Sequence, residues 1–155
     1  RSTQVSGGAQ SALTPMTIAS EVIAMARQAS LYIAGIGEVD AKSFIASGGM
    51  IDDADIAAIK ATGACAEMLG HFFRADGAHA PNSVSDRAMA PRIEDLKSHR
   101  IVALAGGTSK TQAVRAILSS GLVFGLLTDE ATARRLAHGK PGREPGKKNG
   151  KTAPG

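Results

Sequence analysis

The sequence has a single cysteine, Cys65, no tryptophan, and only five aromatic residues, one Tyr and four Phe. One cysteine excludes an internal disulfide and a cysteine-based zinc site, and it fits a reducing compartment. So few aromatic rings also argue against base-stacking platforms for single-stranded nucleic acid. A core built mainly from Ala, Ile, Leu, Val and Met is therefore expected.

Long apolar runs are also missing. No segment approaches the roughly 20 apolar residues that a transmembrane helix needs. The first fifteen residues, RSTQVSGGAQSALTP, lack the charged-then-apolar order of a signal peptide. These absences predict a cytoplasmic protein.

Excess charge is absent from most of the chain. The formal charge is +4 and the pI is near 9.5, but residues 1–138 hold 13 basic and 13 acidic residues. Residues 139–155 hold five basic residues and one acidic residue. The high pI therefore gives no reason to infer a nucleic-acid surface on the folded part. The Gly, Pro and Lys content of 139–155 predicts a disordered basic tail.

The length of 155 residues with 43% apolar residues predicts one domain with its own core. Residues 1–20 are expected to be a loose lead-in followed by a helix start. Thr14-Pro15 is typical of a helix N-terminus, and Ile18, Val22 and Met25 follow at helical spacing, to about Ala29.

The middle of the chain is less regular. An apolar run at 31–36 predicts a buried strand that ends in a glycine turn. Acidic residues from Asp52 onward predict the start of a helix. The geometry of 64–73 stays open. Further predictions are a short helix or turn at 40–47, a turn at Asp76-Gly77 and a loop over 78–92.

The clearest pattern begins at Arg100. Residues 101–105 predict a strand, 106–110 a loop, 111–120 a helix and 122–127 a second strand. Thr128-Asp129-Glu130 then caps a last helix that runs to about Ala137. This order is a βαβ unit, which implies parallel strands and a right-handed crossover.

The loop Gly106-Gly107-Thr108-Ser109-Lys110 is the best candidate for a ligand site. Glycines let backbone amides approach an anion, the loop enters a helix at its electropositive end, and Lys110 adds a full charge. The spacing is not that of a nucleotide-binding P-loop. A tight turn with a solvated lysine explains these five residues equally well.

Two other positions were weighed. Gly35-Ile36-Gly37 resembles the opening of a dinucleotide fingerprint, but Asp40 stands where a third glycine is needed, so NAD binding is rejected. Gly35 and Gly37 are assigned to a turn that lets a ligand or a neighbouring backbone approach, and both are candidate ligand-binding residues. Glu67 lies in an apolar run, where it either accepts hydrogen bonds from sugar hydroxyls or points to solvent from an amphipathic helix.

The remaining reactive residues suggest neither a metal site nor an acyl-transfer enzyme. No Ser has a His/Asp arrangement beside it, and no histidine has a partner at metal-ligand spacing. The histidines are expected to be surface or loop residues: His71, His79, His99 and His138. No cofactor is predicted.

Four blocks, taken together and in order, resemble one family. They are LYIAGIGEVD, GACAEMLGHFFRADG, DRAMAPRIEDLKSHRIVALAGGTSKTQAVRAIL and LLTDEATARRL. They are similar to the second half of the effector domain of SorC-type transcriptional regulators, formerly grouped with the DeoR type. Residues 21–138 would then be the C-terminal portion of a sugar-binding domain.

The resemblance implies an α/β fold with a Rossmann-like parallel sheet and flanking helices. This fold is related to glucosamine-6-phosphate deaminase, ribose-5-phosphate isomerase and the CoA transferases, and it would be incomplete at its N-terminus. It also implies that Lys110, beside Gly106 and Gly107, contacts the phosphate of a phosphorylated sugar. Glu67 would form a hydrogen bond to the sugar. Asp129, which opens the TDE block, is a further candidate ligand-binding residue.

The chain departs from the family in three places. The helix-turn-helix that binds DNA is not in this sequence, and residues 1–20 stand where the first half of the effector domain is expected. Ser47-Gly48-Gly49 replaces a basic residue that some relatives carry in the loop before the second helix. A partial sheet has an exposed edge, which predicts self-association.

The leading hypothesis is a non-enzymatic domain that senses a phosphorylated sugar and modulates a DNA-bound assembly. A phosphosugar isomerase or deaminase of the related fold is the alternative. A third possibility is a ligand-free remnant that acts only in oligomerisation.

Overall fold

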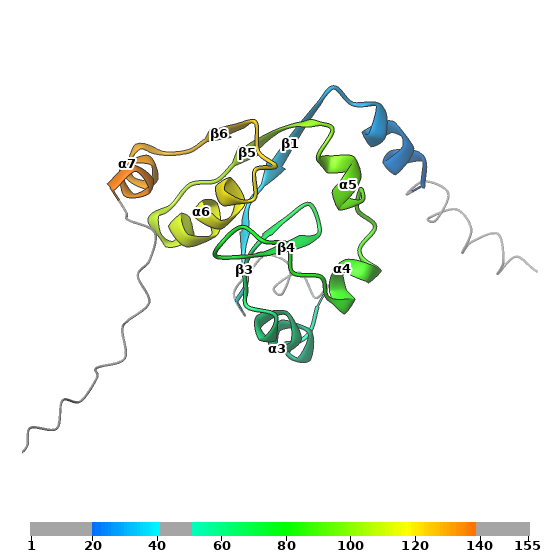
Figure 1. Cartoon of the computed structure of the whole chain (residues 1–155), viewed down its shortest axis with the longest axis horizontal. Coiled ribbons are helices and arrows are strands. Elements are labelled where there is room, and N and C mark those ends of the chain that lie inside the picture. The colour runs from blue at the N-terminus through cyan, green and yellow to red at the C-terminus, as the bar shows by residue number, and fades with distance from the viewer. Residues whose placement is uncertain (1–19, 41–50, 139–155) are drawn as a thin grey trace, which may run out of the picture.

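The computed structural model describes residues 20–40 and 51–138 (Figure 1). A helix at 20–28 comes first. Several predictions lie outside the described residues. They are the lead-in over 1–19 with the helix start at Thr14-Pro15, the short helix or turn predicted at 40–47 (apart from residue 40), Ser47-Gly48-Gly49, and the tail over 139–155. No helix within the described ranges is both long enough and apolar enough to cross a membrane.

A three-stranded parallel sheet contains β1 (Leu31–Gly35), β5 (Arg100–Leu104) and β6 (Gly125–Leu127) in the order β1-β5-β6. Helix α6 (Thr111–Ser119) connects β5 to β6, so the predicted βαβ unit and the α/β class are confirmed. The second strand is shorter than predicted because residues 122–124 precede the ladder.

One face of this sheet builds the core. Tyr32 and Ala34 of β1 pair with Ile101 and Ala103 of β5, and all four are buried. The buried side of α6 packs over them with Ala113, Val114, Ala116 and Ile117. This arrangement follows from the spacing of apolar residues at three and four along α6.

A second, antiparallel sheet contains β2 (Gly37–Glu38), β3 (Ala64–Met68) and β4 (His71–Arg74). The segment 64–73, whose geometry the sequence left open, is a β-hairpin. Its two-residue turn has positive φ at both positions, 54° at Leu69 and 79° at Gly70, as hairpins with the right-handed strand twist require. Glu67 therefore lies on a strand, and the amphipathic-helix alternative is wrong.

The prediction of a glycine turn after β1 is also wrong. Gly35 ends β1 and Gly37 begins β2, so the chain passes nearly straight from the parallel sheet into the antiparallel one. Ile36 is buried between the two sheets, and its amide donates to the carbonyl oxygen of Leu104 at 3.3 Å.

Short helices surround the hairpin. Helix α3 (Asp53–Ala61) begins at Asp52, which forms a capping box with Asp55, as the acidic run predicted. The expected loop over 78–92 instead contains α4 (Ser83–Arg87), because Asn82 accepts from the amides of Val84 and Ser85.

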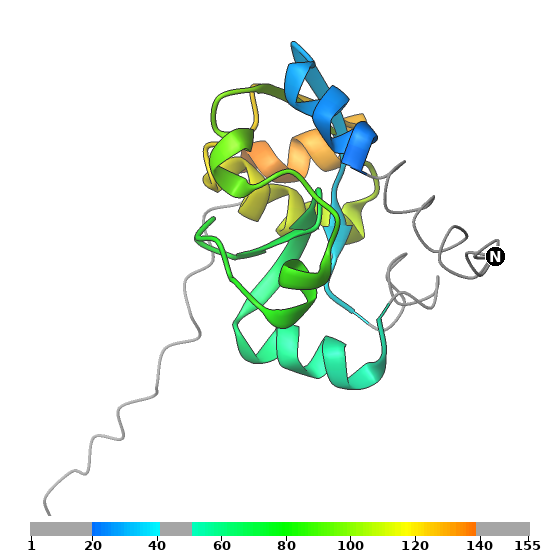
Figure 2. The same ribbon diagram turned by 90° about the vertical axis from the view of Figure 1, so that its right-hand side faces the viewer.

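Three further elements complete the described chain. Helix α5 (Ile93–Leu96) precedes β5, a 3₁₀ turn η1 (Thr108–Lys110) leads into α6, and α7 (Glu130–His138) follows β6. Figure 2 shows helix 20–28 and α3 at opposite ends of the molecule, with α6 and α7 at the same end as helix 20–28.

Two glycines near the end of α6 differ in the space around them. Gly77 and Gly121 both have positive φ, at 85° and 72°. A Cβ on Gly77 would lie 2.3 Å from the backbone carbon of Ser119, whereas one on Gly121 meets nothing within 4 Å. We therefore expect Gly121→Ala to cost about 1 kcal/mol and Gly77→Ala about 3 kcal/mol or more, measured by denaturant unfolding. Equal losses would contradict the backbone contact.

Candidate functional site

The loop Gly106–Lys110 leaves the carboxyl end of β5 and enters α6 through η1. Gly107 has a φ of 98°, which only glycine adopts without strain. Neither η1 nor α6 receives a side-chain cap, so amides of the first turn point out of the helix start without a side-chain acceptor. Such amides, with the helix dipole behind them, favour an anion.

Asp129 holds this loop in place. Its Oδ2 accepts from the Gly107 amide at 2.7 Å and from the Thr132 hydroxyl at 2.7 Å, and its Oδ1 accepts from the Thr132 amide at 2.8 Å. These bonds, that from Gly107 foremost, lower the pKa of Asp129 to about 2. Asp129 thus caps α7 and ties it to the loop.

The position of Asp129 also favours glycine at position 106. A Cβ on Gly106 would lie 3.0 Å from Asp129 Oδ2. The prediction that Asp129 helps to cap the last helix is confirmed. Sequence reasoning missed Thr132, although its three-residue spacing from Asp129 is a capping signal. It also missed the bond from the Gly107 amide, because a contact between positions 22 residues apart leaves no local pattern.

Lys110 connects the loop to the end of β1. Its Nζ donates to the carbonyl oxygen of Ile36 at 3.2 Å, and within 20–40 and 51–138 it forms no ion pair. One main-chain oxygen leaves two of the three ammonium hydrogens for a ligand. The half-buried ammonium is therefore positioned and still carries an uncompensated charge. Sequence reasoning missed the role of Ile36, because a main-chain carbonyl has no sequence signal.

Glu67 lies on the other side of Ile36. Strand β3 pairs Glu67 with Gly37, and a Cβ on Gly37 would lie 2.9 Å from Glu67 Oε2. Glu67 Oε1 accepts from the Gly70 amide at 2.8 Å. Burial raises the pKa of Glu67, opposed by the Gly70 amide and by His71.

The predicted site residues thus form two connected groups. In the first group, Lys110 donates to the carbonyl oxygen of Ile36, and the next residue, Gly37, pairs with Glu67. Gly106 and Gly107 meet Asp129, and Thr108 accepts from the Thr111 hydroxyl at 2.7 Å. Gly35 is different, because it is exposed with nothing within 4 Å of its Cβ position. A cation with free amides at one end and a half-buried carboxylate at the other suits a ligand with an anionic group and hydroxyls. No group of metal ligands occurs in the described residues.

The histidines correct a prediction. His71 is buried, not a surface residue. Its Nε2 lies 2.8 Å from the carbonyl oxygen of Pro91 and so donates to it; in that tautomer Nδ1 accepts from His79 Nε2 at 3.2 Å. Burial, and then the nearby His71, lower the pKa of His79. His99 is also half-buried and bonds the carbonyl oxygens of Asp95 and Arg27.

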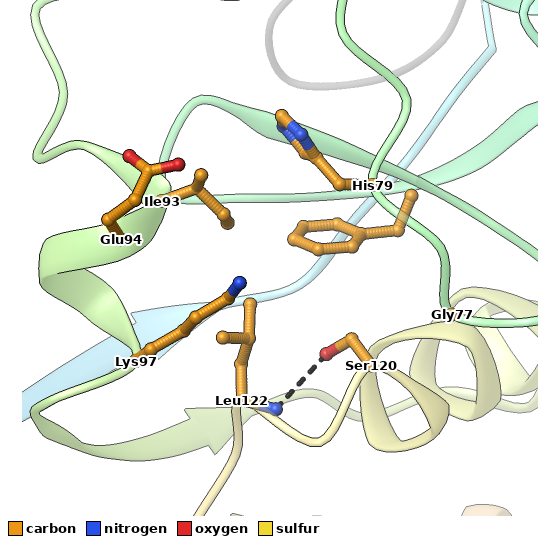
Figure 3. Close-up of a pocket in the computed structure, with 8 residues that line it drawn as sticks. Gly77, His79, Ile93, Glu94, Lys97, Ser120 and Leu122 are labelled. Atoms are coloured by element: carbon orange, nitrogen blue, oxygen red, sulfur yellow. Dashed lines mark hydrogen bonds between the residues drawn. The ribbon is translucent and has the colours of Figure 1, made fainter.

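Figure 3 shows a separate cavity of about 320 Å³. The Lys97 ammonium and the His79 ring face it, and the Ser120 hydroxyl accepts from the Leu122 amide at 3.3 Å. Lys97 and Leu122 precede β5 and β6, so this hollow lies at the amino ends of the parallel strands. Ligands of open parallel sheets bind at the carboxyl ends. The cavity contains none of the predicted site residues; its lining is Phe73, Gly77, His79, Ile93, Glu94, Lys97, Ser120 and Leu122.

The contact between Gly37 and Glu67 gives a matched pair of variants. Gly37→Ala forces Glu67 Oε2 to move, and the bond from the Gly70 amide to Oε1 opposes that movement, so we expect a loss of about 1 kcal/mol. Gly35→Ala, which has open space around its Cβ, is expected to be neutral. In a Glu67→Ala background, which already lacks the Gly70 bond, Gly37→Ala should cost little further stability in thermal melts. Additive losses in the double variant would contradict the contact.

The bonds of Asp129 predict a pH dependence. Its folded pKa of about 2 lies below the ordinary value of 3.8, so the stabilisation is present above about pH 4 and is lost as the pH falls toward 2. Asp129→Asn keeps an oxygen for the Thr132 amide and loses the acceptor for Gly107. The variant should therefore show a flatter stability profile between pH 4 and 2, measured by urea unfolding. Asp86→Asn, on α4, is the control, and its profile should follow the wild type.

Comparison with known proteins identifies relatives of this chain. A family model described as "Putative sugar-binding domain" matches residues 3–138. The erythritol catabolism regulatory protein EryD of Brucella abortus (strain 2308) is 45% identical over 115 residues, which are 74% of this chain and 36% of that protein.

Solved structures show the same fold. A domain of a possible sugar-binding transcriptional regulator from Arthrobacter aurescens TC1 is 30% identical, with a TM-score of 0.67 over 76% of this chain and 45% of that one. A DeoR family regulator from Listeria monocytogenes is 26% identical, with a TM-score of 0.70 over 76% of this chain and 48% of that one. The chain spans only part of each relative, and it belongs to the sugar-binding domain family of SorC- and DeoR-type transcriptional regulators.

Proposed function

We propose that the chain binds a phosphorylated sugar or polyol, with the phosphate on the Gly106–Lys110 loop and the hydroxyls toward Glu67. The observation that carries this proposal is the position of Lys110. Its ammonium is fixed to the Ile36 carbonyl at 3.2 Å without a carboxylate partner in the described chain. A positioned, uncompensated cation beside free helix amides supports binding of a dianion.

Glu67 is the group proposed to accept hydrogen bonds from the hydroxyls of the ligand. Its carboxylate lies one residue from Ile36 across the β2–β3 ladder, so it faces the same end of the sheet as the loop. Because burial raises the pKa of Glu67, a hydroxyl donor from a ligand would stabilise its charged form. The match with a regulator of erythritol catabolism supports a short polyol phosphate as the first probe.

In this proposal, ligand binding regulates assembly. The ligand shifts the equilibrium between assembly states of a regulator by binding one state better than another. DNA contact belongs to a helix-turn-helix outside this sequence, and the chain self-associates. No observation in the described residues favours the isomerase or deaminase alternative, and the relatives reported above are regulators.

Calorimetric titration tests the site. We expect erythritol 4-phosphate or another sugar phosphate to bind, erythritol alone to bind far more weakly, and Lys110→Ala to reduce affinity at least tenfold, because a charge-assisted bond is worth about 1.5–3 kcal/mol.

Lys97→Ala is the matched control, since Lys97 lines the separate cavity, and it should bind like the wild type. Wild-type indifference to a panel of phosphorylated sugars, or equal losses in both lysine variants, would contradict the proposed site.

A further inference from the structure

The cavity in Figure 3 has an apolar wall that the core holds in place. Its volume is about 320 Å³, at the lower end of the range of ligand pockets, so it suits a small molecule. Phe73 is 1% exposed and belongs to the main core, and Ile93 and Leu122 pack against that core. These three side chains offer a fixed apolar surface to a ligand.

Main-chain contacts hold another part of the lining. A Cβ on Gly77 would lie 2.3 Å from the backbone carbon of Ser119, so the chain at Gly77 lies directly against the end of α6. The Ser120 hydroxyl donates to the carbonyl oxygen of Ile117 at 2.6 Å and accepts from the Leu122 amide at 3.3 Å. The cavity is therefore formed by contacts within the chain, and binding requires little ordering of its walls.

Two side chains of opposite charge line the same cavity, Lys97 and Glu94. Neither forms an ion pair within 20–40 and 51–138. Figure 3 shows the Lys97 ammonium directed into the cavity. Burial lowers the pKa of His79 most, followed by His71; among the smaller effects, Glu94 raises this pKa and Lys97 lowers it. Both charges therefore lie near the His79 ring.

The His79 ring supplies a neutral hydrogen-bond acceptor. Its lowered pKa keeps the ring uncharged near pH 7. Because its Nε2 donates to His71 Nδ1 at 3.2 Å, its own Nδ1 carries a lone pair in that tautomer. No hydrogen bond to His79 Nδ1 occurs in the part of the chain that the structure describes. A donor on a ligand can therefore bind there.

We propose that this cavity binds a small zwitterion with an aliphatic side chain, an α-amino acid of the size of leucine. The carboxylate of the ligand contacts the Lys97 ammonium, its ammonium contacts His79 and Glu94, and its side chain packs on the apolar wall. One positive and one negative side chain match a ligand of zero net charge. A plain anion fits less well, because Glu94 and the negative end of the α6 dipole beside Ser120 both repel it.

Titration of the chain with L-leucine, followed in amide NMR spectra, tests the proposal. We expect shifts concentrated at Gly77, Lys97 and Leu122, and none in the Gly106–Lys110 loop. Leucinamide lacks the carboxylate and 4-methylpentanoate lacks the ammonium. Each should bind about tenfold more weakly than L-leucine, because each loses a charge-assisted contact.

Three variants separate the roles of the charges. Lys97→Ala should weaken the binding of L-leucine about tenfold. Lys60→Ala, at an exposed lysine on α3, is the matched control and should bind like the wild type. Glu94→Gln should reduce the preference for L-leucine over 4-methylpentanoate, a change that a purely structural role of Glu94 would not produce.

Four results would overturn the proposal. They are an absence of shifts with L-leucine, shifts confined to residues 106–110, equal binding of L-leucine and 4-methylpentanoate by the wild type, and equal losses in the two lysine variants. The titrations contain no sugar phosphate, so failure of the proposed sugar-phosphate site leaves this test intact.

Discussion

The main chain of Ile36 is the constraint on which the rest of the site depends. Its amide donates to Leu104 and its carbonyl accepts from Lys110, at 3.3 and 3.2 Å. Both bonds form because β1 continues into β2 without a turn. The buried residue Ile36 therefore lies directly between a strand of one sheet and a strand of the other. The separation between the Gly106–Lys110 loop and Glu67 is therefore fixed by strand geometry, which is stiffer than a loop. A ligand that fits this separation meets groups that are already placed, and less ordering entropy opposes binding.

Asp129 also fixes the conformation of the Gly106–Lys110 loop, through a hydrogen bond from the loop backbone. Its carboxylate takes up the Gly107 amide, which a bound phosphate could otherwise use, and at the same time caps α7. A negative charge near an anion site is unfavourable, but three hydrogen bonds already disperse it. In the proposed function, the remaining amides of η1 and the Lys110 ammonium are the groups that would bind an anion. The loop conformation is thus set by an internal carboxylate, before a ligand arrives.

Local chemistry made much of this fold predictable. Apolar periodicity identified β5, α6 and the parallel pairing, and acidic residues identified the start of α3. Long-range contacts decided the rest. The turn at Leu69 places a bulky residue at positive φ, which the hairpin tolerates only because both strands are packed. Glu67 and Lys110 were identified as candidates, but their link through Ile36 joins positions 36 and 110, and no sequence spacing reveals it. The burial of His71 depends likewise on Pro91, twenty residues away.

The balanced charge of residues 1–138 bears on how the proposed site would select an anion. Residues 1–138 balance 13 basic against 13 acidic residues, so their net charge does not attract an anion. In the proposed function, recognition would come from short-range contacts of Lys110, the amides and Glu67, whose strength grows as water is excluded. Leu104 and Leu127 are exposed, and they lie two positions before Gly106 and Asp129 in the chain. Covering these two side chains would exclude water near the loop, and a lower local dielectric would strengthen the contact between the positioned Lys110 ammonium and an anion.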